Sequence, residues 1–107
     1  MGGDLLQGTV ELMVLKALSL EPMHGWGIGQ RLDQMSREVF SIPHGSLYPA
    51  LQRMLIKGWV IAKWGTTAGN RRARYYQLTA AGRKQLPVEM SQFKRVIGAI
   101  TRVIEAV

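Results

Sequence analysis

The chain has 107 residues, 47% hydrophobic and 20% charged, a composition typical of one small globular domain and not of a disordered chain. Because it has no cysteine and only two histidines, which lie far apart in the sequence, we expect no disulfide, no metal and no other cofactor. The net charge is +7, and the segment between Val39 and Val88 contains eight basic residues and no acidic one, which predicts a polyanionic partner, either nucleic acid or an anionic membrane surface.

The first predicted element is a helix over residues 5–20, which ends where Glu21 precedes Pro22. Its apolar residues spread around most of the circumference, so it needs cover on several sides, and we expect a partner subunit to supply part of that cover. The apolar stretch around Lys16 is shorter than the about 18 residues of a membrane span, and no basic segment precedes it. We therefore predict no membrane helix, no signal peptide and a cytoplasmic location.

A second helix is predicted from His24 or Gly25 to about Arg37, followed by a turn over residues 38–42. A third helix lies within residues 43–57 and stops at Gly58, a residue favoured just past a helix end. Its start is open: either Pro43 takes the first helical position, or Ser46 caps a later start that puts Pro49 in the first turn.

Residues 59–64 and 73–78 have the composition of strands and predict a hairpin with a tip of about eight residues. Thr79 caps a last helix, which Pro87 kinks or restarts and which runs to the C-terminus. This order predicts a mainly α fold with a small β-hairpin: a winged helix-turn-helix domain over residues 1–80, and a C-terminal dimerisation helix over residues 81–107 that packs as one unit with the first helix.

The third helix divides into two faces. Leu47, Leu51 and Met54 form an apolar face, and the outward face has small residues, an amide and a guanidinium, with Tyr48 at its edge: Gly45, Ser46, Pro49, Gln52 and Arg53. Gln and Arg can each make paired hydrogen bonds to purine edges in the major groove. Any surface helix also shows a polar face, so this pattern alone leaves DNA reading and simple exposure open.

Three arginines follow in the hairpin. Arg71 and Arg72 fall at the tip with Asn70, where they could reach a phosphate or the minor groove. Strand alternation puts Arg74 on the same face as Tyr76 and Leu78, so we assign DNA contact first to the two tip arginines. In isolation the same residues would be read as a solvated loop.

The last helix has apolar residues at alternating spacings of three and four, which predict a short heptad-like seam: Met90, Phe93, Ile97, Ile100, Ile104 and Val107. The alternative is a helix that packs back on its own domain. We favour a homodimer built from the first and last helices, with Leu12 and Leu15 on the first. The tryptophans Trp26, Trp59 and Trp64 are interpreted as core or interface anchors.

Four motifs in order carry a family resemblance: LLQGTVELMVLKAL at 5–18, HGWGI at 24–28, GSLYPALQRM at 45–54 and NRRARYYQLTAAGRKQL at 70–86. The chain resembles the PadR family of bacterial transcriptional regulators, in particular its smaller subgroup and the PadR-like regulators of acidobacterial genomes. The resemblance implies a dimeric repressor on a palindromic operator of double-stranded DNA. The sequence shows no nucleophile–base pairing, no carboxylate pair in a polar setting and no phosphate-binding glycine loop, so we expect no enzyme. The implied DNA-binding residues come from helix 43–57 and wing 65–72: Ser46, Tyr48, Pro49, Gln52, Arg53, Asn70, Arg71, Arg72 and Arg74.

The chain also departs from the family pattern. Met54-Leu55 stands where Leu-Glu is common, Trp26 where Tyr is usual, and Pro87 interrupts the last helix. Some relatives bind hydrophobic effectors at the dimer interface, where Phe93 could serve, so a ligand-responsive sensor is one alternative. A winged-helix module for protein–protein interaction is another.

Overall fold

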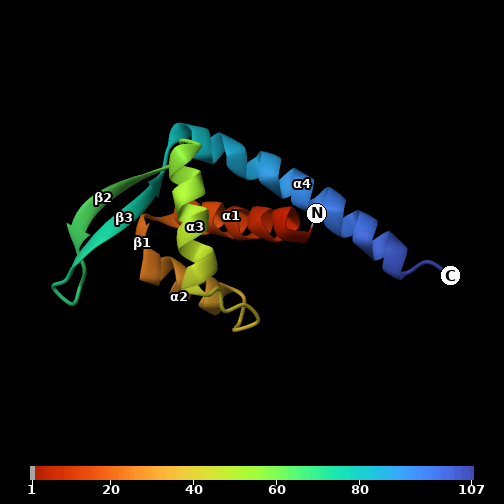
Figure 1. Ribbon diagram of the computed structural model, residues 1–107, viewed down its shortest axis with the longest axis horizontal. Coiled ribbons are helices and arrows are strands. Elements are labelled where there is room, and N and C mark those ends of the chain that lie inside the picture. The colour runs from red at the N-terminus through yellow and green to blue at the C-terminus, as the bar shows by residue number, and fades with distance from the viewer. Residues whose placement is uncertain (1) are drawn as a thin grey trace.

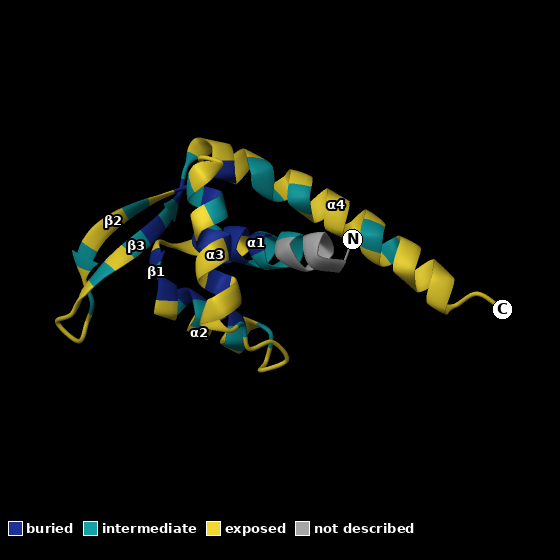
Figure 2. Ribbon diagram, viewed as in Figure 1, coloured by how far each residue is buried: buried dark blue, intermediate teal, exposed yellow. Residues whose placement is uncertain are grey.

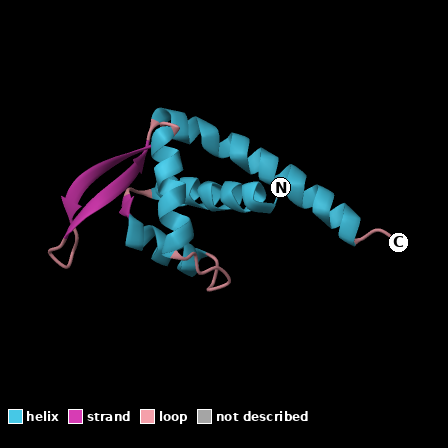
Figure 3. Cartoon of the chain, in the orientation of Figure 1, coloured by secondary structure: helices cyan, strands magenta, loops and turns pink. Residues whose placement is uncertain are grey.

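The computed structural model describes residues 2–107, and the side chains of residues 8–107. Four helices and a small antiparallel sheet make up the chain, which confirms the winged-helix architecture predicted from the sequence (Figures 1 and 3). The elements follow in the order α1 (Gly2–Leu20), β1 (Met23–His24), α2 (Gly25–Met35), α3 (His44–Ile56), β2 (Val60–Thr66), β3 (Arg72–Leu78) and α4 (Ala80–Ile104). None of the described helices is both long and apolar enough to cross a membrane.

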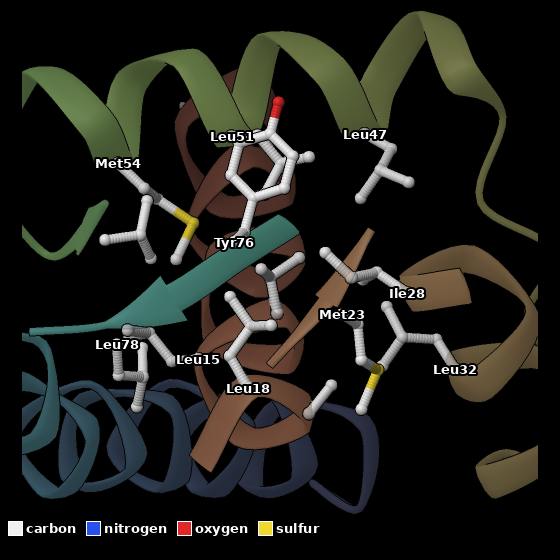
Figure 4. Close-up of a cluster of buried hydrophobic side chains, with 13 residues drawn as sticks. Leu15, Leu18, Met23, Ile28, Leu32, Leu47, Leu51, Met54, Tyr76 and Leu78 are labelled. Carbon is white, nitrogen blue, oxygen red and sulfur yellow. The ribbon is translucent and has the colours of Figure 1, made fainter. Parts of the chain in front are cut away.

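The core gathers around α1, which contacts α2, α3, α4 and β3. Leu15 and Leu18 of α1 are buried together with the apolar face of α3, and Tyr76 of β3 points from the sheet toward Leu51 (Figure 4). Burying such apolar surface is the main source of stability in a domain of this size. Over the described side chains, from residue 8 on, the first helix therefore receives most of its cover from its own chain, whereas we expected a partner subunit to supply part of it.

The sheet contains a strand that was not predicted. β1 is only two residues long and pairs with β3 through Met23–Tyr76 and His24–Tyr75, so the strand order is β1-β3-β2. His24 then begins α2 directly, since its Nδ1 accepts a hydrogen bond of 3.0 Å from Gly27 N. The strand ties the start of α2 to the base of the hairpin.

The structure shows which of the two predicted starts α3 has. It begins at His44 with Pro43 as the N-cap, so Ser46 is a helical residue and Pro49 lies inside the helix. Pro49 lacks the N–H that would bond to the carbonyl of Gly45, and the absent side chain of Gly45 removes one source of crowding. Both residues are exposed, so water can reach the unbonded carbonyl.

Helix α4 passes through Pro87 without a break, so the restart suggested by that proline does not occur. Thr79 caps the helix as predicted, and its side chain accepts a hydrogen bond of 3.0 Å from Gly82 N. The second half of α4 extends beyond the other elements and is mostly exposed, so that the chain with this helix measures 57 × 29 × 22 Å (Figure 2).

Candidate nucleic-acid interface

The exposed side of α3 carries most of the predicted reading residues. Ser46, Pro49 and Gln52 are exposed, and the opposite side of the helix is buried in the core. Tyr48 is 43% exposed and leans over Gly25 of α2, where a Cβ would come within 2.6 Å of the tyrosine hydroxyl oxygen. A residue larger than glycine at position 25 would displace the ring, so this contact holds the start of α2 close to α3.

Arg53 lies differently from the outward orientation that the helical pattern predicts. Its Nε is 3.0 Å from Oε1 of Glu11 in α1, and Nζ of Lys57 is 3.1 Å from Oε2 of the same carboxylate. Glu11 is only 5% exposed, so Arg53 of α3 and Lys57, the residue just past its end, neutralise a buried charge of α1. Because the Arg53 side chain stays 30% exposed, it lies at the edge of the exposed side of α3.

Glu11 is a residue that the sequence analysis did not single out. An unpaired buried carboxylate is costly, so an acid within an apolar helix predicts a basic partner somewhere in the fold. That signal was visible in the sequence, but the partners are 42 and 46 residues away and could not be chosen without the structure.

The hairpin is longer and its tip tighter than predicted. The strands continue to Thr66 and Arg72, and the loop between them closes with hydrogen bonds from Asn70 N to Thr67 O (2.9 Å) and from Thr67 N to Arg71 O (2.8 Å). Asn70 has a φ of 61°, the left-handed conformation that follows the turn in short hairpin loops and that Asn adopts more readily than most residues. The loop is thus a defined turn.

The three wing arginines are all exposed, and no described carboxylate pairs with any of them. Arg71 stands at the tip, whereas Arg72 and Arg74 share one face of β3 with Tyr76 and Leu78, as strand alternation predicts. The Cζ of Arg72 is 4.5 Å from the ring centroid of Trp64, and that of Arg74 is 5.9 Å from the ring centroid of Tyr76. The two arginines on this face of β3 therefore lie near aromatic rings, and no described acid neutralises their charge.

The predicted dimer residues separate into two groups. Leu15 has no exposed surface and belongs to the core of a single chain, so it cannot form part of an interface as we expected; Leu12 is half-buried. The residues of α4 remain open, with exposures of 39% for Met90, 36% for Phe93, 43% for Ile97, 40% for Ile100 and 76% for Ile104. These side chains are thus partly covered by their own chain and keep a third or more of their surface exposed.

The tryptophans also differ from one another. Trp59 is half-buried against the core, in keeping with an anchor, but Trp26 and Trp64 are 56% and 61% exposed and contribute little to the core. Within the described residues, no cluster of three or more histidine or acidic side chains could hold a metal ion.

Residues 14–88 match the model of the transcriptional regulator PadR-like family. A transcriptional regulator from Clostridium thermocellum aligns with a TM-score of 0.84 at 22% identity, over 95% of this chain and 99% of that one. A putative transcriptional regulator from Thermoplasma acidophilum gives 0.82 at 26% identity, over 97% and 98%. Bacillus subtilis PadR in complex with operator DNA gives 0.67 at 18% identity, over 77% of this chain and 46% of that one. The family and these neighbours are transcription regulators and not enzymes.

Proposed function

Because the chain belongs to the PadR-like family of transcriptional regulators, we propose that it is a repressor that binds a palindromic operator as a homodimer, through α3 and the wing. The observation that carries the proposal is the wing: three exposed arginines, with no described acid to neutralise them, stand on a hairpin whose strand β2 contacts α3. Among the neighbours, Bacillus subtilis PadR is solved with operator DNA, which supports the same class of ligand here.

In this proposal the two elements have different tasks. The amide of Gln52 is the group on the exposed side of α3 best suited to paired hydrogen bonds with a base, while Ser46, Tyr48 and Pro49 approach the backbone or the bases near the helix start. Asn70, Arg71, Arg72 and Arg74 contact phosphates or the minor groove. Arg53 contributes through the guanidinium nitrogens that Glu11 leaves free.

The test is an electrophoretic shift assay with the DNA upstream of the gene that encodes the chain. We expect the logarithm of affinity to fall linearly with the logarithm of salt concentration, with a slope of about −0.9 per phosphate contact. A scrambled duplex of equal length is the control, and it should bind more weakly. Absence of binding at low salt would contradict the proposal, as would tight binding that salt does not weaken.

The homodimer rests on the exposed stripe of α4, since apolar residues at heptad-like spacing need a partner that the domain does not supply. Replacing Ile97 or Ile100 by Glu should shift the protein to monomer in sedimentation experiments, because the charge would lie within the seam. Gln92→Glu, which adds the same charge on an exposed position away from the stripe, should leave the dimer intact. If Ile97→Glu stays dimeric, α4 does not form the seam.

A hydrophobic effector at the same seam is the second candidate, favoured by the part-exposed Phe93 and Met90. A ligand that binds the folded dimer should raise the melting temperature, by an amount that grows with the logarithm of its concentration once this exceeds the Kd. A panel of aromatic acids and hydrophobic cations that leaves both melting temperature and DNA affinity unchanged would count against it.

The chain's motifs and its single 25-residue last helix support the smaller, acidobacterial-like PadR subgroup, and DNA binding supports a cytoplasmic location.

A further inference from the structure

Trp64 stands where a tryptophan has no evident structural task. It is 61% exposed, lies outside the buried core cluster, and occupies the part of β2 that extends past the core. A large apolar side chain left this open gains little from folding, because most of its surface stays in water. Its main described contact is the guanidinium of Arg72, 4.5 Å from the ring centroid.

The sheet register explains why these two side chains meet. Trp64 is directly opposite Arg74, and Arg72 is opposite Thr66, so Trp64 and Arg72 are diagonal neighbours on one face of the hairpin. Diagonal neighbours in an antiparallel pair come within reach when the side chains are long or aromatic. The same face continues to Tyr76, which packs beneath α3 beside Leu51, so the pair lies on the side of the sheet that α3 covers (Figure 4).

The opposite face of the hairpin keeps the strands in place without using Trp64. The ring of Tyr75 lies over Gly65, where a Cβ would come within 2.9 Å of it, and the Tyr75 hydroxyl donates a hydrogen bond of 3.3 Å to Thr66 O. The strand pairing and this contact fix the backbone of the wing. Trp64 is therefore free to act on Arg72 and is not needed to hold the hairpin together.

We propose that Trp64 is a positioning residue for DNA binding: its indole ring holds the Arg72 guanidinium in place so that the N–H groups are presented to a phosphate of the DNA backbone. A guanidinium stacked on a ring keeps its donors free at its edge, and ordering it beforehand reduces the entropy lost on binding. The inference rests on the proposed function. Because phosphates carry no sequence information, Trp64 should affect all DNA sequences alike.

Arg71 and Arg72 provide an internal comparison. Both are exposed wing arginines, but of these two only Arg72 has an aromatic ring beneath it among the described contacts. A double-mutant cycle between Trp64→Leu and Arg72→Gln, with a second cycle between Trp64→Leu and Arg71→Gln, separates positioning from a general effect on the wing. Ile61→Ala serves as a control, because Ile61 is exposed on the other face of β2.

The affinity for the upstream duplex and for a scrambled duplex is measured across a salt series. Trp64→Leu should weaken binding about two- to fivefold for each wing on both duplexes, the range of an exposed cation–π contact. The salt slope should not change, since the charge of Arg72 remains, whereas Arg72→Gln should reduce it by about 0.9 per phosphate contact. The Trp64→Leu effect should vanish in the Arg72→Gln background and persist in the Arg71→Gln background.

Two outcomes overturn the inference while leaving the proposed function standing: a Trp64→Leu variant that binds like the wild type, or one whose loss is equal with and without Arg72. A wild type that binds no DNA contradicts the proposed function itself. Thermal unfolding checks that each variant is folded. Trp64→Tyr, which keeps an aromatic face, should retain most of the affinity, and a loss as large as that of Trp64→Leu would also contradict the inference.

Discussion

The C-terminal end of α3, with the residue that follows it, and the wing both belong to the acid-free basic stretch, yet their cations have different partners. Arg53 and Lys57 meet a buried carboxylate from α1, whereas Arg71, Arg72 and Arg74 meet no described carboxylate and two of them lie near aromatic rings. The first pair joins two helices, and the second group remains available to a ligand. The comparison teaches that the number of basic residues in a segment does not locate an anion-binding surface until their partners are known.

The largest effect is expected from removing the free cations. Replacing Arg71 and Arg72 together by Ala should lower DNA affinity about a hundredfold, since each charge-assisted hydrogen bond contributes about 1.5 kcal/mol or more. The free energy of unfolding should change by less than about 0.5 kcal/mol, because both side chains are exposed. Binding titrations and urea unfolding measure the two quantities.

The matched control removes the same charge elsewhere. Arg83 and Lys84 are exposed in the first turns of α4, and replacing both by Ala should lower affinity far less than the wing variant does. If both double variants lose the same affinity, net charge alone attracts the DNA, and the distinction between the two regions fails.

A smaller effect is expected at Glu11, and it concerns the stability of the fold instead of DNA affinity. Glu11→Gln should lower the free energy of unfolding by about 2 kcal/mol, less than the about 3–5 kcal/mol of a fully buried pair, because Arg53 and Lys57 remain partly exposed to water. Urea unfolding measures the loss. Glu21→Gln, an exposed acid just past α1, should change stability by less than about 0.5 kcal/mol. Equal stability of Glu11→Gln and the wild type would mean that this cluster does not hold α3.

The smallest effect is expected at the turn that shapes the wing. Asn70→Ala should cost about 1 kcal/mol, since the left-handed φ of 61° disfavours a Cβ without a polar group, whereas Asn70→Gly should be close to neutral for stability. Thermal unfolding measures both. The glycine variant also separates the backbone from the side chain: if its DNA affinity falls while its stability holds, the Asn70 amide itself contacts DNA.

Local chemistry explains what the sequence could predict. The cap at Thr79, the helix end before Pro22 and the hairpin each follow from side chains within a few residues of the backbone they act on. The sharing of one strand face by Arg74 and Tyr76 follows from alternation alone. Such features need no knowledge of the rest of the fold.

Long-range packing explains what it could not. The helical pattern places Arg53 outward, but Glu11 draws its guanidinium toward α1 from 42 residues away. Leu15 was assigned to an interface because α1 is apolar all round, yet four other elements of the chain cover that helix. β1 has no pattern of its own, since two residues become a strand only because the edge of β3 is beside them. Which of the proposed DNA-binding residues touch DNA remains a prediction for the experiments above.

The hairpin separates α3 from α4 in the sequence, but direct contacts at its base tie the start of α4 to the residues that follow α3, and this has a mechanical consequence. Thr79 N donates to Trp59 O (3.0 Å), its hydroxyl donates to Gly58 O (2.6 Å), and Gly82 packs so closely on the Trp59 carbonyl that a Cβ there would collide with it. Because these contacts tie the start of α4 to the end of α3, we expect the two helices to move together. In a dimer held together by α4, a change in the angle between the two copies of α4 would therefore change the distance between the two copies of α3.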